Sequence, residues 1–283
     1  MPLLPMSEIL DRAYAEGYGV PAFDTWNAET TAAILGLAQD LRAPVILMHA
    51  GPDYGILSPL MLADMTRLFM GYYNVPAALH LDHGRSLEQV QDCLDARYTS
   101  VMLDYSAKPF EENAAALRET VARAHPLGVT VEAEIGHVGR AGASHESSGA
   151  STLTDAQEAA DFVAQTGVDA LAVSIGNAHG HYTALPQFDF ERLAQIRDAV
   201  SLPLVLHGGS GTPDEELRRA ISLGITKVNV VTELVTAVRQ SLLDQWGESR
   251  NKHIPFAYTE ATQAMLPVAE KWFRVCGAVG KAG

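Results

Sequence analysis

Short apolar runs alternate with longer amphipathic stretches along the whole length of the chain. The apolar runs are rich in Val, Leu and Ile and nearly continuous, which is typical of strands covered on both faces. The expected strands are residues 19–23, 44–48, 77–81, 100–103, 130–133, 170–175, 202–206 and 227–230. Because such strands occur in parallel sheets, the pattern favours an α/β protein.

Segments with apolar residues at helical spacing lie between these runs. The expected helices are residues 28–39, 59–69, 86–96, 110–124, 155–165 and 215–223. Thr154 and Thr212 are expected to cap two of them, because acidic residues follow in the first turn. The repeating order of strand and helix, with eight strands in all, favours a closed (β/α)8 TIM barrel over an open sheet.

Further helical patterns flank the repeat, at residues 7–16 before the first strand and at residues 233–246 and 260–273 after the last. We therefore expect residues 1–283 to form a single barrel domain with extra N-terminal and C-terminal helices. Residues 247–255 predict a loop between the last two helices. Residues 136–151 are rich in Gly, Ala and Ser without either periodicity, so we expect a mobile lid there.

Composition and charge limit the classes of function and partner that are possible. Hydrophobic residues make up 47% of the 283 residues and charged residues 19%, which allows a large core and argues against disorder. The formal charge of −14 argues against nucleic acid and anionic membranes as partners. An anionic substrate would need local positive potential, from a metal, backbone N–H groups or a helix N-terminus.

Cysteine usage and hydropathy predict the compartment. The two cysteines, Cys93 and Cys276, lack CxxC spacing and suit a reducing cytoplasm. The first residues lack the pattern of a signal peptide, and no apolar run approaches the ~18 residues that cross a bilayer. We therefore expect a soluble, cytoplasmic protein.

Polar side chains lie where the apolar strands end. They are Asp82, His83, Asp104, Glu134, His179, His207, Asn229 and Thr232. In a barrel the C-terminal strand ends meet at one mouth, where barrel active sites lie. Stability does not require this side-chain chemistry, so the pattern indicates function.

Histidines stand out among these polar residues. A single histidine is more often structural than a ligand, but His83, His179 and His207 each follow a different strand. Three imidazoles at one mouth, with a fourth position open, are typical of catalytic zinc. Asp104 and Glu134 lie at the same level and could orient these ligands or serve as alternative ligands.

A glycine-rich turn, His207-Gly-Gly-Ser-Gly211, follows the seventh strand and precedes a helical stretch. Its small residues allow backbone N–H groups to approach an anion. A plain flexible turn is the simpler interpretation, but the loops after strands seven and eight commonly bind phosphate in these barrels. The position of the turn opposite Asn229 and Thr232 favours a phosphate site.

Asp82 and His80 lie beside the expected ligand His83. Asp82 has two possible roles. It could accept a hydrogen bond from a neighbouring N–H group, which is structural, or it could exchange a proton with a substrate oxygen beside the metal. His80 is expected in the core or in support of a ligand.

At these residues the chain resembles the class II, metal-dependent ketose-bisphosphate aldolase family, and the tagatose-bisphosphate aldolase type in particular. The similarity extends from Val20-Pro-Ala-Phe23 to Val275-Cys-Gly277. The motifs that carry it are His80-Leu-Asp-His83, Val131-Glu-Ala-Glu134, Ala178-His-Gly180, Leu206-His-Gly-Gly-Ser210 and Lys227-Val-Asn-Val230.

The resemblance implies a zinc-dependent enzyme that reversibly cleaves a ketose phosphate to dihydroxyacetone phosphate and an aldehyde. His83, His179 and His207 would bind one Zn2+, and a monovalent cation is an additional candidate. The metal would polarise the ketose carbonyl and stabilise an enediolate, while Asp82 would exchange a proton with the aldehyde oxygen. Residues that would hold the dihydroxyacetone phosphate half are Gly180, Gly208, Gly209, Ser210, Asn229, Val230, Val231 and Thr232. A homodimer or homotetramer is also implied.

One departure from the family lies in the loop after the fifth strand. Relatives usually carry a glutamate eight residues after Glu134, which is proposed to move a proton on the enediolate carbon. Gly142 occupies that position here, so we expect Glu146 or His145 to take this role.

Other departures gather where a second phosphate of the substrate would bind. Asp24 stands where relatives commonly have asparagine, and Lys281 is the nearest match to an arginine near their C-terminus. A carboxylate repels phosphate by about 1 kcal/mol or more at short range. We therefore expect Asp24 and Asn27 to contact the acceptor aldehyde. This aldehyde is either unphosphorylated, or phosphorylated and bound differently. Substrates similar to tagatose or fructose 1,6-bisphosphate are also possible.

Two other functions stay open at this point. A metal-dependent hydrolase on the same barrel generally has an HxH pair at the end of the first strand, and Phe23-Asp-Thr25 offers none. A catalytically lapsed relative that acts as a binding protein is favoured by the missing loop glutamate. The three histidines and Asp82 favour the enzyme over both.

Overall fold

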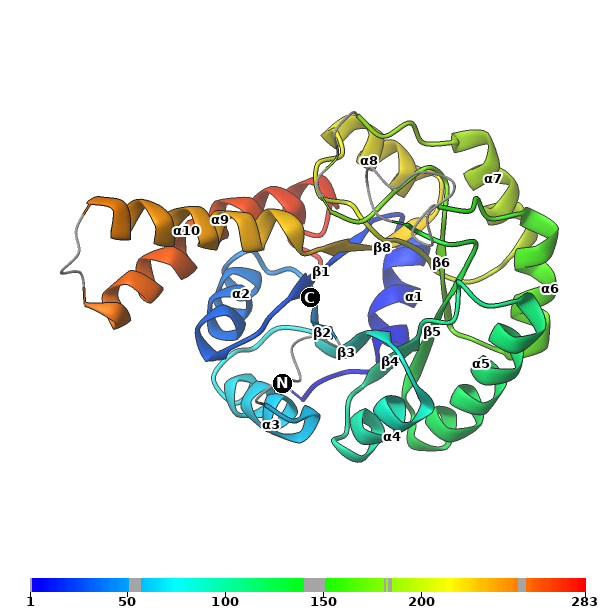
Figure 1. The fold of residues 1–283 in the computed structure, drawn as a ribbon, viewed down its shortest axis with the longest axis horizontal. Coiled ribbons are helices and arrows are strands. Elements are labelled where there is room, and N and C mark those ends of the chain that lie inside the picture. The colour runs from blue at the N-terminus through cyan, green and yellow to red at the C-terminus, as the bar shows by residue number, and fades with distance from the viewer. Residues whose placement is uncertain (1, 51–56, 140–150, 181, 183–184, 249–252) are drawn as a thin grey trace.

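The computed structural model describes residues 2–50, 57–139, 151–180, 182, 185–248 and 253–283. Its parallel strands close into a barrel in chain order, and β1 pairs with β8 to complete the circle (Figure 1). The strands are β1 Val20–Asp24, β2 Val45–Ala50, β3 Ala77–Gly84, β4 Ser100–Leu103, β5 Thr130–Ile135, β6 Ala170–Val173, β7 Leu204–Leu206 and β8 Ile225–Val230. The predicted (β/α)8 TIM barrel is confirmed.

Helices cover the outside of the barrel between successive strands (Figure 1). They are α2 Ala28–Asp40, α3 Pro59–Met70, α4 Leu87–Asp95, α5 Phe110–Ala124, α6 Ala156–Thr166, α7 Phe190–Ala199 and α8 Asp214–Ser222. A short 3-10 helix, His125–Leu127, follows α5. Helix α7 lies where the strand–helix order predicts a helix, although we gave no range for it, and it buries only Leu193 and Ile196.

Neither threonine that we expected to cap a helix does so. The Asp155 side chain caps α6 by accepting from two backbone N–H groups, and Pro213 precedes α8 without a side-chain cap. Thr154 instead hydrogen-bonds the backbone where β5 and β6 end. The prediction failed because the carboxylate next to Thr154 is the stronger acceptor for free N–H groups.

Several predicted boundaries also shift. Strand β3 runs to Gly84, so Asp82 and His83 belong to the strand instead of following it. Strand β6 ends at Val173, earlier than the expected residue 175. Helix α10 begins at Ile254, before the expected residue 260, because Pro255 occupies the first turn, where proline is compatible with a helix.

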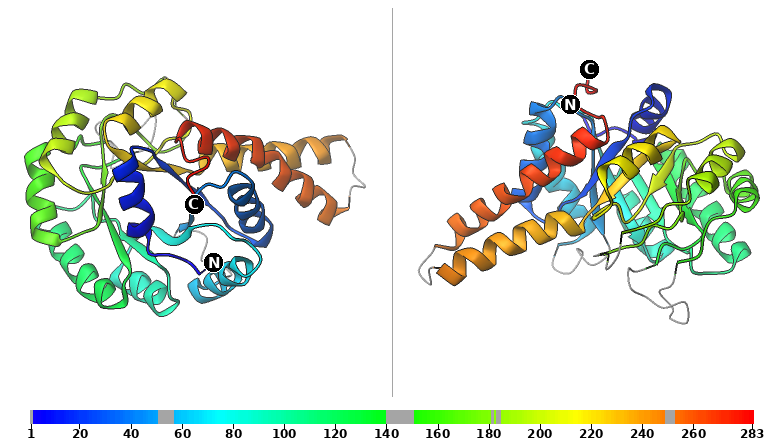
Figure 2. Two further views of the ribbon diagram at one scale, coloured as in Figure 1. Left: turned by 180° about the vertical axis from the view of Figure 1, so that it is seen from behind. Right: turned by 90° about the horizontal axis from the view of Figure 1, so that it is seen from above.

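Helix α1, Met6–Glu16, lies across the N-terminal end of the barrel (Figure 2). The backbone N–H of Leu4 donates to the carbonyl of Ala77 at the start of β3, and that of Ser7 donates to the Thr130 hydroxyl at the start of β5. This end is therefore covered, and the opposite end forms the mouth that faces the viewer in Figure 1.

The two C-terminal helices form a hairpin that projects beyond the barrel (Figures 1 and 2). They are α9 Thr232–Glu248 and α10 Ile254–Val275. The C-terminal part of α10 packs against β1, where the rings of Phe273 and Phe23 meet edge to face at 5.2 Å. A single domain over residues 1–283 stays a prediction, which these contacts support. Among the helices that the structure describes, none is long and apolar enough to cross a membrane.

Candidate active site

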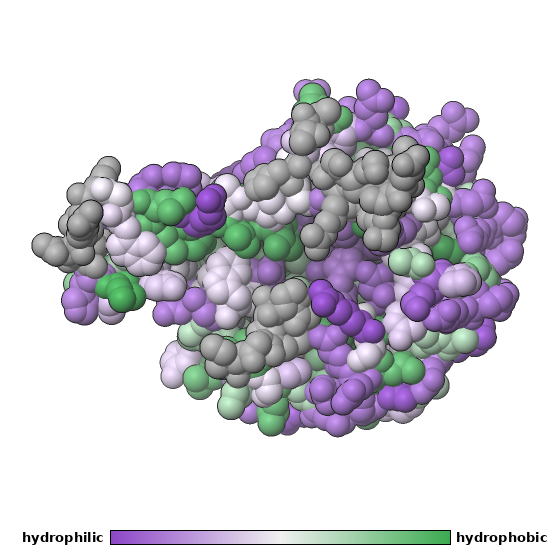
Figure 3. Space-filling view, viewed as in Figure 1, coloured by the Kyte–Doolittle hydropathy of each residue, from purple (hydrophilic) through white to green (hydrophobic). Residues whose placement is uncertain are grey.

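Hydrophilic residues gather in the hollow at the mouth of the barrel (Figure 3). At the end of β3, the pairing with β4 shifts between Leu81 and Gly84, and His83 adopts a left-handed conformation with a φ of 47°. Neighbouring residues of a regular strand point to opposite faces, but such an irregularity re-aims them. Asp82 and His83 can therefore both serve the mouth although they are adjacent in the sequence.

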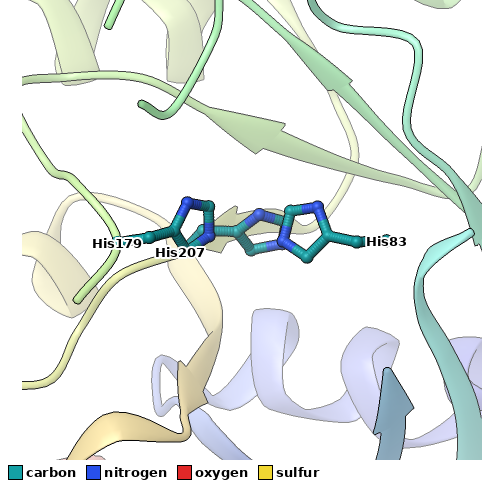
Figure 4. A group of neighbouring side chains, drawn as sticks. All are labelled: His83, His179 and His207. Carbon is teal, nitrogen blue, oxygen red and sulfur yellow. The ribbon is translucent and has the colours of Figure 1, made fainter. Parts of the chain in front are cut away.

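The imidazoles of His83, His179 and His207 point toward one another at this mouth (Figure 4). The ring centroid of His83 lies 4.9 Å from that of His179 and 4.6 Å from that of His207. One ring nitrogen from each residue lies within 4.8 Å of the others. The structure thus brings the three predicted ligands together from β3 and from the segments that follow β6 and β7.

One ring nitrogen of each imidazole is held by an acceptor of the protein. The pairs are His83 Nδ1 with Asp104 Oδ2 at 2.7 Å, His179 Nδ1 with the Val138 carbonyl at 3.0 Å, and His207 Nε2 with Glu132 Oε1 at 3.0 Å. Because carboxylates and carbonyls only accept, each of these nitrogens carries the proton. The opposite nitrogen of each ring is then the one available to a metal, which would take the place of any second proton on the ring.

Those opposite nitrogens are buried and have no hydrogen-bond partner in the described part of the chain. They are Nε2 of His83, Nε2 of His179 and Nδ1 of His207. Three imidazole nitrogens with an open fourth position match the ligand set of a catalytic zinc site. Asp104 and Glu134 add a second group with His83, whose ligand atoms also lie within 4.8 Å of one another. The residues present therefore fit a divalent metal ion, and their roles as ligands stay a prediction.

The charge around these imidazoles also suits a cation. Burial, followed by His83 and His207, lowers the pKa of His179 to about 4, so His179 is neutral at neutral pH. The Glu134 Oε2 lies 2.9 Å from Nδ1 of His207, without hydrogen-bond geometry. Burial opposes a charge on His207, but Glu132 and Glu134 outweigh it and raise its pKa to about 10. A metal at Nδ1 would take the place of the proton that these carboxylates attract.

Asp82, the predicted proton donor and acceptor, is buried beside the histidines. Its Oδ1 accepts a hydrogen bond from Nδ2 of Asn229 at 2.8 Å. Burial opposes ionisation, but His83 and Lys227 hold the pKa of Asp82 below its usual value. Asp82 is therefore a carboxylate at neutral pH, the form that accepts a proton from a substrate hydroxyl.

The glycine-rich turn packs closely against the segment that follows β6. Gly208 has a φ of 65°, and a Cβ at this position would collide with the carbonyl oxygen of Ala178. The Tyr182 hydroxyl joins the two segments, since it accepts from the Ala178 N–H at 2.8 Å and donates to the Gly208 carbonyl at 3.0 Å. Glycine is required at Gly208 by both its conformation and this close approach.

The same turn meets the start of α9. The Ser210 hydroxyl accepts from the N–H of Glu233 at 3.3 Å, and the Gly211 N–H donates to the Glu233 carboxylate at 2.8 Å. Thr232 begins α9 directly after β8, so the N-terminus of this helix lies next to the turn. Helix N-termini attract anions, which agrees with the predicted phosphate site.

Other predicted residues have different outcomes. Asp24 ends β1 and is 7% exposed. The Asn27 side chain caps α2 by accepting from the Thr30 N–H at 2.9 Å, so a structural role accounts for it. Lys281, the nearest match to the C-terminal arginine of relatives, pairs through its Nζ with Glu16 Oε2 at 2.7 Å, at the end of α1 away from the mouth. Gly142, His145 and Glu146 lie outside the described residues.

Sequence reasoning gave no role to a buried ion pair beneath the histidines. Lys227 Nζ lies 2.9 Å from Glu132 Oε2, and both side chains are fully buried. Strand alternation could have directed both side chains into the barrel, because it places Glu132 on the same face of β5 as Glu134 and Lys227 on the same face of β8 as Asn229, but it does not show that the two pair. His80 is buried nearby, with its Nε2 3.7 Å from Glu132 Oε2, as expected for a core or supporting residue.

Two further polar residues at the mouth were also missed. Ser106 follows β4 and hydrogen-bonds Asp104, while His137 follows β5 and hydrogen-bonds Ser106. Neither lies in a strand, so no periodicity pointed to them. A polar residue shortly after a barrel strand is the only signal that the sequence offers.

Comparison with known proteins agrees with this site. Residues 4–281 match the family described as fructose-bisphosphate aldolase class-II. The chain is similar to the YdjI aldolase from Escherichia coli K12, with 35% sequence identity and a TM-score of 0.87 over 99% of this chain and 100% of that chain. It shares its fold with the fructose-bisphosphate aldolase Fba from Campylobacter jejuni, with 23% identity and a TM-score of 0.83 over 98% of this chain and 95% of that chain.

Proposed function

Because this chain belongs to the class II fructose-bisphosphate aldolase family, and is thus an enzyme of the aldolase type, we propose that it uses zinc to cleave a ketose phosphate. The products are dihydroxyacetone phosphate and an aldehyde, and the reverse reaction condenses them. The family is metal-dependent in general. Our proposal adds the identity of the metal, the products and the residues that act on the substrate.

The observation that carries this proposal is the set of buried, unpartnered ring nitrogens on His83, His179 and His207, within the part of the chain that the structure describes. Three imidazoles favour zinc over magnesium or calcium, which prefer oxygen ligands. When bound, zinc supplies Lewis-acid polarisation of the ketose carbonyl. Asp104 and Glu132 hold His83 and His207 with the lone pair facing inward.

Proton transfer at the cleaved bond falls to Asp82. In cleavage, its carboxylate accepts the proton of the hydroxyl that becomes the aldehyde oxygen, and the electron pair of the broken bond stays with the dihydroxyacetone phosphate half. In condensation, Asp82 returns the proton to that oxygen. Asn229 positions the carboxylate through the hydrogen bond at 2.8 Å. For the proton on the enediolate carbon, the predicted residue is still Glu146 or His145.

The phosphate of the substrate would bind between the glycine-rich turn and the start of α9. The turn offers Gly208, Gly209 and Ser210, and the dipole of α9 adds an attraction for anions at its N-terminus. The chain carries a formal charge of −14, so this local positive potential is needed to attract a phosphate. The Tyr182 hydroxyl links the segments after β6 and β7, which supports the proposal that Gly180 contributes to the same phosphate site.

The acceptor aldehyde, in our proposal, carries no phosphate close to Asp24. Asp24 is nearly buried at the end of β1, where its carboxylate would repel a phosphate and accept hydrogen bonds from sugar hydroxyls. A ketose 1-phosphate is therefore favoured as the substrate. A bisphosphate similar to tagatose or fructose 1,6-bisphosphate, with its second phosphate bound differently, is the alternative.

The experiment is aldol cleavage by zinc-loaded protein on a panel of ketose 1-phosphates and 1,6-bisphosphates. Release of dihydroxyacetone phosphate is followed with a coupled dehydrogenase, beside a sample treated with a chelator. Release that stops with the chelator and returns with Zn2+ supports the proposal. Zinc-loaded protein that releases nothing from any substrate, but still binds them, would indicate a lapsed enzyme that acts as a binding protein.

The assembly and the compartment are further parts of the proposal. We propose a homodimer or homotetramer, which is supported by exposed apolar side chains on the projecting hairpin. These side chains are Val235, Leu243, Trp246, Ile254, Phe256 and Tyr258. A cytoplasmic location is supported by the buried thiols of Cys93 and Cys276, which form no disulfide with each other. Light scattering during size-exclusion chromatography measures the assembly, and a monomer at micromolar concentration would contradict it.

A further inference from the structure

A chain of hydrogen bonds leads from His83 at the metal-binding mouth to a partly exposed histidine after β5. The His83 Nδ1 lies 2.7 Å from Asp104 Oδ2. The other oxygen of Asp104 accepts from the Ser106 hydroxyl at 2.7 Å and from the Ser106 backbone N–H at 3.1 Å. The Ser106 hydroxyl oxygen lies 2.9 Å from Nδ1 of His137.

Each proton in this chain has a defined place. Burial opposes ionisation of Asp104, but the hydrogen bonds from His83 and Ser106 hold its pKa well below its usual value, so it only accepts. The single hydroxyl proton of Ser106 goes to Asp104, and Ser106 must then accept from Nδ1–H of His137. At the other end, Asp104 accepts from Nδ1–H of His83, which leaves the lone pair at His83 Nε2 for the metal.

We propose that His137 is a positioning residue of the metal centre. Its Nδ1–H holds the Ser106 hydroxyl on Asp104, and Asp104 in turn holds the ring of His83 with Nε2 toward the metal. This inference rests on the proposed role of His83 as a ligand. Hydrogen bonds in such a chain strengthen one another, so the loss of the first donor weakens the hold on the last ring.

The backbone at His137 is itself well placed for this role. His137 and Thr152 exchange two backbone hydrogen bonds at 2.8 Å, which anchors the residue. The next residue, Val138, donates its N–H to Glu134 at 2.9 Å and accepts from Nδ1 of His179 at 3.0 Å. Residues 137 and 138 therefore support His83 and His179 from one short segment.

The His137 side chain is 24% exposed, so a substitution there leaves the core of the barrel intact. Because packing would be little changed, an effect of the substitution on metal binding would come from the lost hydrogen bond. The amide nitrogen of asparagine can take the place of the ring Nδ1, whereas that of glutamine takes the place of Nε2. His137→Asn therefore keeps the donor to Ser106, His137→Gln moves it, and His137→Phe removes it.

The test measures the Zn2+ dissociation constant of each variant by competition with a chromogenic chelator. We expect His137→Gln and His137→Phe to bind Zn2+ about 10-fold more weakly, a magnitude typical of residues that orient ligands. His137→Asn should retain the wild-type affinity. Equal affinities in His137→Asn and His137→Gln, or an unchanged affinity in His137→Phe, would overturn the proposal.

A second set of variants tests whether His137 acts through Ser106. In the Ser106→Ala background, His137→Gln should weaken Zn2+ binding no further, because the link to Asp104 is already broken. Full additivity of the two substitutions would contradict this path. Urea unfolding of the metal-free variants, with unchanged midpoints expected, controls for damage to the fold.

This result can be separated from the proposed function. If wild-type protein binds no Zn2+ and its cleavage activity is insensitive to chelator, the proposed metal-dependent function itself fails. If wild-type protein binds Zn2+ and cleaves a ketose phosphate, while His137→Gln binds Zn2+ equally well, only the role of His137 fails.

Discussion

The Nζ of Lys227 lies 2.9 Å from Oε2 of Glu132, with both side chains fully buried at the base of the histidine cluster. The other oxygen of Glu132 accepts from Nε2 of His207 at 3.0 Å. Burial opposes ionisation of Glu132, but Lys227, with His80 and His207, holds its pKa far below the usual value. Lys227 thus keeps Glu132 ionised, and the ionised carboxylate holds the ring of His207 in the histidine cluster.

Removal of Lys227 should therefore destabilise the fold. Lys227→Met leaves the Glu132 charge buried without its main partner, which typically costs about 3–5 kcal/mol. Urea unfolding of the metal-free protein measures this loss in the free energy of unfolding. The double variant Lys227→Met/Glu132→Gln removes the charge as well and should recover part of the stability. Equal losses in both variants would contradict the argument, because packing alone would then explain them.

Substitution of Asp82 should separate proton transfer from metal binding. Asp82→Asn keeps an oxygen that can accept from Asn229 but removes the carboxylate that takes up a proton. We expect kcat for aldol cleavage to fall by about 10²–10⁴-fold, the usual contribution of a general acid or base. The metal content, measured by mass spectrometry, should match that of the wild type. Cleavage at the wild-type rate would exclude Asp82 from proton transfer.

Bound metal should also stabilise the protein, and the three histidines make this effect specific. At a free Zn2+ concentration 100 times the dissociation constant, the free energy of unfolding should rise by about 2.7 kcal/mol. His179→Ala removes a proposed ligand that burial, with His83 and His207, keeps neutral, so it should gain far less from the same Zn2+. Thermal unfolding with and without chelator measures both gains. A gain in His179→Ala equal to the wild-type gain would place the metal elsewhere.

The fold and the clustering of the three histidines could be predicted from the sequence for one physical reason. Parallel strands that are covered on both faces read as continuous apolar runs, and their C-terminal ends must meet at one mouth. His83, His179 and His207 could therefore be grouped although 124 residues separate the first from the last. Their grouping required only the strand order, not any detail of packing.

The supporting contacts depend on details that the sequence pattern does not contain. The sequence does not signal the left-handed conformation at His83, with its φ of 47°, because residues other than glycine adopt positive φ uncommonly. Lys227 and Glu132 are 95 positions apart in the sequence and contact each other across the barrel, so only the closed geometry shows that they pair. The pairing of Lys281 with Glu16 likewise depends on where the C-terminus lies in the fold.

Acid should destabilise the protein through His49, which is buried at the mouth end of β2. Its Nδ1 lies 2.7 Å from the Tyr98 hydroxyl, and burial lowers its pKa from 6.5 to about 3. The unfolded chain takes up a proton near pH 6.5, whereas the folded one does so only near pH 3. The stability that His49 contributes is thus present above pH 6.5 and lost as the pH falls toward 3.

At pH 5, this linkage should cost the wild type about 2 kcal/mol relative to pH 7.5. His49→Asn keeps a polar group near Tyr98 but does not titrate, so it should lose less over the same range. Urea unfolding at both pH values, with chelator present to remove metal effects, compares the two proteins. Parallel losses would assign the acid sensitivity to other groups.

Replacement of Asp24 should change the preferred substrate. Asp24 lies nearly buried at the end of β1, so its charge is poorly screened by solvent and acts strongly on a nearby phosphate. Asp24→Asn removes that charge at constant size, and kcat/KM for ketose 1,6-bisphosphates should rise about 10-fold or more, which corresponds to a repulsion of about 1.4 kcal/mol. The value for ketose 1-phosphates should fall, because the amide replaces a stronger hydrogen-bond acceptor for sugar hydroxyls.

Asn27→Ala is the matched control for Asp24→Asn, since residue 27 lies close by. It should lower stability through loss of the α2 cap without a change in the ratio of kcat/KM for bisphosphates to that for 1-phosphates. An unchanged preference in Asp24→Asn would show that the second phosphate, where present, binds beyond the reach of this carboxylate.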